Sequence, residues 1–342
     1  MIKTPALHLS RREFIATSAT TALTASAFGS SALASTFPSR DIELLLGVGP
    51  GGGTDRSARL IGRYWESMLP GNQRVTYVPR QGAGGLIALQ ALLDAPPDGH
   101  TVMFYPVPHI ASFFQLGQIP DMDNDAVGWI GTLFNDPNVL LVPADSPYET
   151  IADFIDAARN SSEPFTISGS TPLSNAHFST VLVRELTGAN LQFVPFGGGG
   201  DARNAVAGGH VDGCIAPYWS ALGVLELTKA IGIFQDSNPA PDLWQPVPAN
   251  DVLDVEIPAL SEPYAMFCSA AVRDENPEAF STLVSSFKET VNSDEFRAAA
   301  ASEDLAEFLV DWDADATSKF VEEYVALVDE YLPIMRTDVE EM

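Results

Sequence analysis

The chain has 342 residues, enough for two ordinary domains, and 46% of them are hydrophobic, so it can bury a full core. Its formal net charge of -27 at pH 7 argues against a nucleic-acid partner, whose phosphates need a basic surface. The same charge requires that an anionic ligand be neutralised locally, which backbone N–H groups and helix ends can do without lysine. An acidic surface of this kind also suits a salty medium, where charge repulsion is screened.

The first 34 residues form a predicted export signal. Residues 10–15 contain the twin arginines Arg11 and Arg12, a weakly apolar stretch follows, and residues 32–34 read Ala-Leu-Ala, an A-x-A cleavage pattern. This order predicts a twin-arginine signal peptide over residues 1–34, removed near Ala34, and a periplasmic protein. No cysteine stands at the cleavage point, and no later run approaches the ~18 apolar residues of a membrane span. We therefore expect no permanent membrane anchor.

A glycine-rich loop follows the first predicted strand, residues 42–46, and precedes a predicted helix over residues 56–68. Glycine lets the backbone turn through positive φ and leaves no Cβ in the way, so the loop amides and the helix N-terminus can converge on an anion. We predict a carboxylate cradle here. An ordinary turn, with Thr54 or Asp55 as the helix N-cap, is the alternative. The predicted cradle spans residues 47–55, which include Pro50, Gly51, Gly52, Gly53, Thr54 and Asp55.

Two nucleotide-binding interpretations of this loop are weaker. Gly47, Gly49 and Gly52 satisfy G-x-G-x-x-G, but the next strand, residues 74–78, ends in Pro-Arg and offers no carboxylate for a ribose. A phosphate-binding P-loop needs Lys-Ser or Lys-Thr after the glycines, and neither follows.

Strands and helices alternate along the rest of the chain, which predicts an α/β fold with a parallel sheet. Three further loops, at residues 82–85, 169–175 and 196–201, join a strand to a helix and are rich in glycine or hydroxyl groups. Four such loops on two sets of strands predict two lobes that face one cleft. Ordinary strand-to-helix turns, which glycine also suits, are the alternative for each loop taken alone.

The sequence contains no convincing catalytic or metal-binding set. There is no G-x-S-x-G motif, and the histidines of the predicted mature chain, His100, His109, His177 and His210, are scattered without metal-ligand spacing. We therefore predict a binding protein with no catalytic residues, no metal and no cofactor. His177 lies in the first turn of a predicted helix, where it either reaches a ligand or packs as a structural residue.

Cysteines and aromatic residues give two further expectations. Cys214 and Cys268 each lie in an apolar run, which favours two buried free thiols, with a disulfide as the alternative. Tyr105 and Tyr218, with Trp219, end strands and could pack on an aromatic ligand or belong to the core.

An ordered series of segments resembles the Bug-type solute-binding proteins of tripartite tricarboxylate transporters. The resemblance covers most of the predicted mature chain. The segments are residues 38–42, 49–55, 81–85, 95–101, 138–142, Gly169-Ser170 with His177, 194–198 and 208–212.

The resemblance implies a two-lobed periplasmic binding protein of type II, with lobe 1 at residues 35–136 plus 256–342 and lobe 2 at 137–255. It implies a small carboxylate ligand, a di- or tricarboxylate or an aromatic acid, held between the lobes and delivered to membrane permease subunits, and we expect a monomer. Lobe 1 would contribute residues 50–55 and Gly82, Ala83, Gly84 and Gly85. Lobe 2 would contribute Gly169, Ser170, Ser174, Asn175, His177, Phe196, Gly197 and Gly198.

The chain departs from the family pattern near the expected cleft. Pro79-Arg80-Gln81 stands where the family has Asn-Arg-Pro, and the hydroxyl loop reads Ser-Thr-Pro-Leu-Ser at residues 170–174. The identity of the carboxylate therefore stays open. An exported α/β enzyme with a nucleotide-type cofactor and a sensor-input receptor for the same ligand are the alternative functions.

Overall fold

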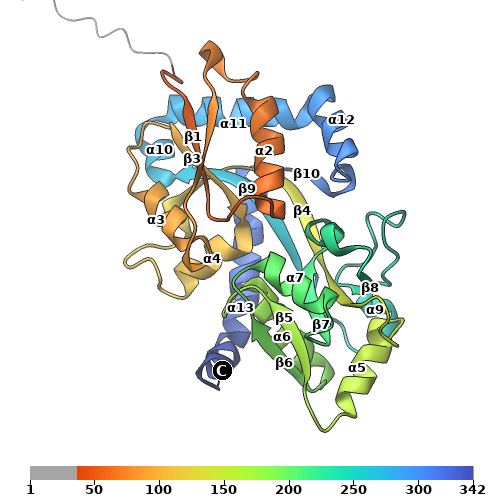
Figure 1. Cartoon of the computed structure of the whole chain (residues 1–342). Coiled ribbons are helices and arrows are strands. Elements are labelled where there is room, and N and C mark those ends of the chain that lie inside the picture. The colour runs from red at the N-terminus through yellow and green to blue at the C-terminus, as the bar shows by residue number, and fades with distance from the viewer. Residues whose placement is uncertain (1–36, 342) are drawn as a thin grey trace, which may run out of the picture.

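The computed structural model describes residues 37–341, so the predicted signal peptide at residues 1–34 lies outside the described residues. Two lobes lie one above the other in Figure 1 and share one continuous sheet, ordered β2-β1-β3-β9-β4-β7-β5-β6, with β8 and β10 also paired to β4. The predicted two-lobed α/β fold is confirmed.

In the first lobe, β1 pairs in parallel with β2 and β3, and β9 joins β3 to β4 by antiparallel pairing. Short β10 lies antiparallel to the early part of β4. These strands are β1 (Ile42–Leu46), β2 (Val75–Pro79), β3 (Thr101–Pro106), β9 (Ser261–Ser269), β10 (Leu309–Trp312) and β4 (Val127–Pro143).

In the second lobe, β5 pairs in parallel with β6 and β7, while the end of β4 pairs antiparallel with β7 and β8. The carboxyl ends of the parallel strands β1 and β5 point toward the gap between the lobes (Figure 1). The strands that belong to this lobe alone are β5 (Phe165–Gly169), β6 (Leu191–Pro195), β7 (Gly213–Pro217) and β8 (Thr228–Ile233).

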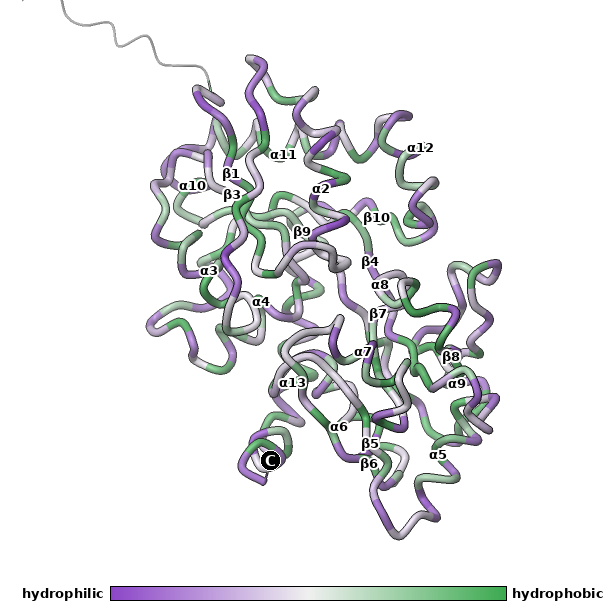
Figure 2. Tube along the Cα trace, viewed as in Figure 1, coloured by the Kyte–Doolittle hydropathy of each residue, from purple (hydrophilic) through white to green (hydrophobic). Residues whose placement is uncertain are grey.

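Helices cover both faces of the sheet, and two hydrophobic clusters run through both lobes. Alternate residues of one strand enter different clusters, as Leu44 and Leu45 do, because successive side chains of a strand point to opposite faces. Figure 2 shows hydrophobic stretches along the strands of both lobes. The helices are α2 (Gly53–Trp65), α3 (Leu86–Leu93), α4 (Val107–Gln115), α5 (Ile151–Arg159), α6 (Asn175–Thr187), α7 (Gly199–Ala207), α8 (Tyr218–Ala221), α9 (Ala249–Val252), α10 (Ala270–Glu275), α11 (Pro277–Asn292), α12 (Asp294–Ser302) and α13 (Ala314–Glu341).

Strand β4 is the main connection between the lobes. Its residues 127–137 pair with β9, and its later residues pair with β7 and β8. Helix α13 also spans the lobes, since it packs against α4 and against α6 (Figure 1). The lobe boundaries at 136/137 and 255/256 remain predictions. The first boundary lies within β4, and the second lies before β9.

Several elements escaped sequence prediction. Strands β8 and β10 and helix α4 correspond to no element predicted from the sequence. Helix α4 was missed because Pro108 suggests a break, whereas it lies in the first turn, where its missing N–H costs nothing. Cys214 and Cys268 are both buried free thiols, so the favoured prediction is confirmed.

Candidate functional site

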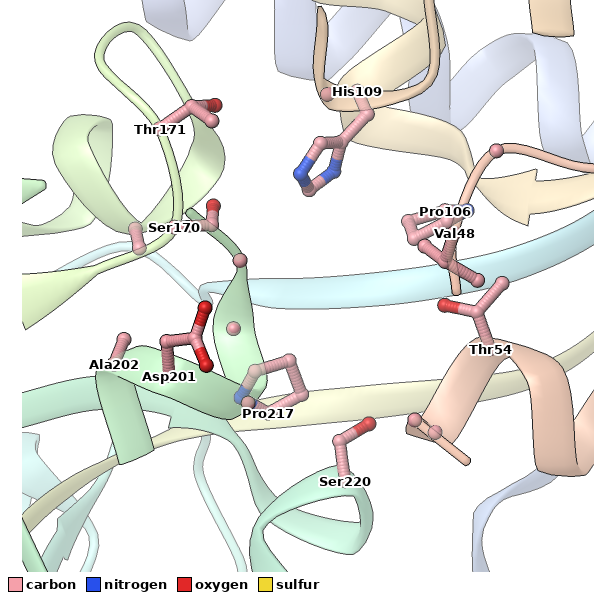
Figure 3. A pocket seen from close by; sticks show the side chains of 18 of the residues that line it. Val48, Thr54, Pro106, His109, Ser170, Thr171, Asp201, Ala202, Pro217 and Ser220 are labelled. Carbon is pink, nitrogen blue, oxygen red and sulfur yellow. The ribbon is translucent and has the colours of Figure 1, made fainter. Parts of the chain in front are cut away.

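A cavity of about 700 Å³ lies between the lobes and receives residues from both. Figure 3 shows Thr54 and Val48 on one side, Ser170 and Asp201 on the other, and the ring of His109 projecting into the space between. The loop after β1, the loop after β2, and the loops after β5 and β6 all reach this one cavity. The glycine-rich turns thus share a common gap.

Helix α2 begins at the cavity wall. Gly52 is its N-cap, so the alternative that placed Thr54 or Asp55 there is wrong. Asp55 instead accepts the N–H of Gly51 at 2.9 Å and the Nε–H of Arg59 at 2.9 Å, which fixes the loop on the helix. The first intrahelical bond runs from Arg56 N to Gly52 O, so the three preceding helix amides find no acceptor within residues 37–341.

Helix α7 repeats this arrangement in the second lobe. Its N-cap is Gly198, and its first intrahelical bond runs from Ala202 N to Gly198 O. The N–H groups of Gly199, Gly200 and Asp201 therefore lack an acceptor in the part of the chain that the structure describes. Two helix N-termini, one from each lobe, present free donors and the positive end of a helix dipole to one cavity.

The loop after β2 is built from left-handed backbone. Residues 82–85 all have positive φ, from 46° at Ala83 to 130° at Gly82. Tyr105 holds the loop in place, because its hydroxyl donates a hydrogen bond to Gly84 O at 2.6 Å. A Cβ at Gly85 would lie 2.6 Å from the Tyr105 ring, so this close packing requires glycine.

Asp136 occupies the N-terminus of the short helix α8, so the amides of Trp219 and Ser220 are not available to a ligand. Asp136 is fully buried and accepts the N–H groups of Trp219 and Ser220 and the hydroxyl of Ser220 at 2.8–3.0 Å. Burial, with a smaller contribution from the nearby Glu262 carboxylate, raises the pKa of Asp136 to about 7, against the lowering effect of these bonds.

Charged and titratable side chains also line the cavity, and sequence reasoning did not select them. They are Asp201, Arg203, Glu262 and His109. Asp201 lies within a predicted glycine loop and could have been named. Glu262 had no comparable signal, because the sequence contains many acidic residues and only the fold shows that this one lines the cavity.

The structure brings twelve of the predicted site residues to the cavity lining. They are Pro50, Gly52, Gly53, Thr54, Gly82, Ala83, Gly84, Tyr105, Gly169, Ser170, Gly197 and Gly198. It places the others behind the lining or away from it. These are Gly51, Asp55, Gly85, Ser174, Asn175, His177, Phe196 and Tyr218.

His177 faces away from the cavity and connects α6 to α13. Its ring stacks on Phe193, its Nδ1 accepts the N–H of Leu173, and its Nε2 donates to Asp338 at 3.3 Å. Burial lowers its pKa. The structure therefore gives His177 the packing role that the sequence left as one of two alternatives.

Four other predicted residues also have structural partners. Ser174 caps α6 by accepting the N–H of His177, and the Phe196 N–H donates to Gly169 O and Ser170 O. Tyr218 is buried, and its hydroxyl accepts from Trp244 N at 2.8 Å. Asn175 lies on a separate cavity of about 380 Å³ and donates to Glu262.

Membrane-spanning helices and metal-ion clusters are both absent from residues 37–341. No helix there has the length and apolar character to cross a membrane. No three His, Cys, Asp or Glu side chains of this region are grouped so that they could hold a metal ion.

The fold and the cavity define a two-lobed solute-binding protein. The sequence matches the tripartite tricarboxylate transporter family receptor over residues 70–332, and the chain belongs to this family. The resemblance seen in the sequence is thereby confirmed, and the family's members are periplasmic receptors.

Curated relatives agree with this assignment. A UPF0065 protein in the gbd 5' region of Cupriavidus necator is 27% identical over 308 residues, covering 87% of this chain and 90% of that one. A UPF0065 protein in the tcbD-tcbE intergenic region of Pseudomonas sp. (strain P51) is 31% identical over 179 residues, and this alignment spans about half of each chain, 52%.

Solved structures share the fold. MatC from Rhodopseudomonas palustris with bound malate has a TM-score of 0.72 at 20% identity, covering 85% of this chain and 98% of that one. Rpa4515 of R. palustris with adipate has a TM-score of 0.74 at 21% identity, covering 87% and 98%.

Proposed function

We propose that this receptor captures a small organic acid between its lobes and presents it to the membrane permease subunits of a tripartite tricarboxylate transporter. One observation carries the proposal: the N-termini of α2 and α7 bring acceptor-free N–H groups to one cavity from opposite lobes. Helix N-termini stabilise anions through both their amides and their dipole. A dicarboxylate could place one carboxylate on each helix.

The size and chemistry of the cavity support this ligand class. A volume of about 700 Å³ falls in the usual range for small-molecule sites. Malate and adipate, the ligands of the two R. palustris structures, are both dicarboxylates. A ligand that bridges the lobes favours the closed arrangement by its higher affinity for it.

Thermal unfolding with a panel of mono-, di- and tricarboxylates tests the ligand class. An acid present at about 100 times its dissociation constant should stabilise the folded protein by roughly 2.7 kcal/mol. A folded protein whose melting temperature responds to none of these acids would overturn the proposal.

The cellular part of the proposal needs a separate experiment. We place the protein in the periplasm, exported through the twin-arginine route, acting as a monomer without a cofactor or catalytic step. Uptake of the labelled acid should require both the receptor gene and the permease genes. Uptake that persists without the receptor gene would contradict the transport role. Binding of the acid in vitro would then still support a receptor that does not serve this transporter.

A further inference from the structure

A second cavity, of about 380 Å³, has walls from both lobes and is separate from the cavity that the helices α2 and α7 enter. Phe178 of α6 belongs to the second lobe and Trp312 of β10 to the first, and α13, which spans the lobes in Figure 1, contributes further residues. Asn175 lines the second cavity and donates at 3.3 Å to Glu262, which lines the first, so the two cavities meet at this pair. The volume of the second cavity falls in the usual range for small-molecule sites.

Four aromatic rings follow one another along the wall of the second cavity. The rings of Trp312 and Phe320 have centroids 5.8 Å apart, and Phe320 stacks on Tyr324 at 6.1 Å. Phe178 meets Tyr324 edge-on at 5.9 Å. Phe320 and Tyr324 are four residues apart on α13, so their rings lie on one face of that helix. Aromatic rings attract one another in stacked and edge-to-face arrangements, so this wall favours an aromatic ligand.

One polar atom among the lining residues has no partner. Asn135 of β4 lines the second cavity, and its Oδ1 is buried and accepts no hydrogen bond from residues 37–341. A buried acceptor without a donor has lost its hydrogen bond to water without replacement. A ligand that carries an N–H or O–H group therefore gains free energy by donating to this oxygen.

The charge of the lining favours a neutral ligand. Among the described residues, Glu323 is the one charged side chain that lines the second cavity, and no Lys, Arg or His lies there to balance an anion. The Glu323 side chain is 68% exposed and pairs with Lys319 at 3.6 Å, so it lies at the rim and is not free to hold a buried cation. Burial of an unpaired charge of either sign is costly.

We propose that the second cavity binds a small neutral aromatic molecule with one hydrogen-bond donor, of the indole or phenol type. The ring packs against the series Trp312, Phe320, Tyr324 and Phe178, and the N–H or O–H group donates to Asn135 Oδ1. The site differs in position and in chemistry from the one proposed for the organic acid, so neither proposal depends on the other.

Equilibrium dialysis with indole and benzofuran tests the proposal. The two molecules have nearly the same shape, but benzofuran has an oxygen where indole has its N–H. We expect one indole per chain, bound at least about fivefold more tightly than benzofuran, because only indole satisfies the buried acceptor. In Asn135→Leu, which removes the acceptor at similar size, the two affinities should lie within about twofold of each other.

Leu327→Trp tests whether indole occupies the second cavity. Leu327 lines this cavity from α13, and a larger side chain there should fill the space and weaken indole binding at least about tenfold. The matched control is Ala326→Trp, at the neighbouring exposed position of the same helix, which should keep wild-type affinity for indole.

Absence of saturable indole binding to the wild type would overturn the proposal. Benzofuran binding as tightly as indole, or wild-type indole affinity in Leu327→Trp, would do the same. If Leu327→Trp did not fold, Asn135→Leu would decide, because a preference for indole that survived loss of the acceptor would place the molecule elsewhere. Failure of the organic acids alone would count against the proposed function and leave this site in place.

Discussion

Asp136 on β4 and Glu262 on β9 are directly opposed partners in the antiparallel pairing of the strands that join the lobes. Both carboxylates are more than nine-tenths buried. Burial raises the pKa of Asp136 to about 7, and the neighbouring Glu262 carboxylate contributes to this rise. The connection between the lobes therefore contains a group that holds a proton in mildly acidic conditions.

This pairing predicts that stability decreases as pH rises through neutrality. The pKa of Asp136 is raised from 3.8 to about 7, so the folded state binds a proton that the unfolded state has released. The stabilisation is fully present below the unfolded pKa of 3.8 and is lost as pH rises through about 7. Up to about 4 kcal/mol of unfolding free energy depends on this proton.

Urea denaturation of the wild type and Asp136→Asn between pH 4 and pH 8 measures how much of the unfolding free energy depends on this proton. Asn keeps one acceptor for the α8 amides but cannot titrate, so its unfolding free energy should fall less over the range. Asp145→Asn, at an exposed position, is the matched control and should follow the wild type. Equal pH slopes for the wild type and Asp136→Asn would contradict the prediction.

Gly52→Val should abolish tight ligand binding and leave the fold intact. Gly52 has φ -77° and ψ 172°, an ordinary extended backbone, and no atom lies within 4 Å of an added Cβ. The valine methyls would cover the free amides of α2. Loss of one or two charge-assisted hydrogen bonds corresponds to roughly 10- to 100-fold weaker binding of the best acid from the panel.

The control for this variant is Gly223→Val, another glycine with open space around its added Cβ, which does not line the cavity. Calorimetry should give it wild-type affinity, and circular dichroism should show both variants folded. If Gly52→Val bound the acid with wild-type affinity, the start of α2 would not be part of the ligand site.

Gly85→Ala should destabilise the protein. Gly85 has φ +104°, and its added Cβ would lie 2.6 Å from the Tyr105 ring, so both backbone strain and overlap oppose the change. We expect a loss of about 1–3 kcal/mol of unfolding free energy. Tyr105→Phe, which loses only the bond to Gly84 O, should cost less, about 1 kcal/mol. The opposite order in urea denaturation would contradict this account of the loop.

The sequence predicts those parts of the cavity that have a local signal. Glycine runs after strands, at residues 50–53, 82–85 and 197–198, mark positions where the backbone must turn and expose its amides. Glu262 and His109 have no such signal. Antiparallel pairing of β9 with β4 and β3 brings Glu262 to the cavity, and such pairing between distant segments has no pattern within a short window.

The direction of the side chain explains why some of the predicted residues do not line the cavity. The loop before α6 does enter the cavity with Gly169 and Ser170, but helical rotation turns His177 toward Phe193 and α13. Tyr218 likewise follows a strand that lines the cavity, yet its ring enters the core and bonds the backbone of Trp244. Local position was predictable, whereas the direction of each side chain depends on packing between distant elements.

Asp338→Ala should destabilise the protein without changing its affinity for the ligand. Asp338 accepts two bonds from Arg184 at 2.9 and 3.1 Å and one from His177, and none of the three residues lines the cavity. Loss of these partly buried, charge-assisted bonds should cost about 1–3 kcal/mol of unfolding free energy in urea denaturation. The affinity of the best acid, corrected for the folded fraction, should stay within about twofold, because removing bonds distant from the ligand changes little binding energy. A large loss of affinity in the folded variant would show that the contact between α6 and α13 shapes the cavity, and would restore a ligand-related role to His177.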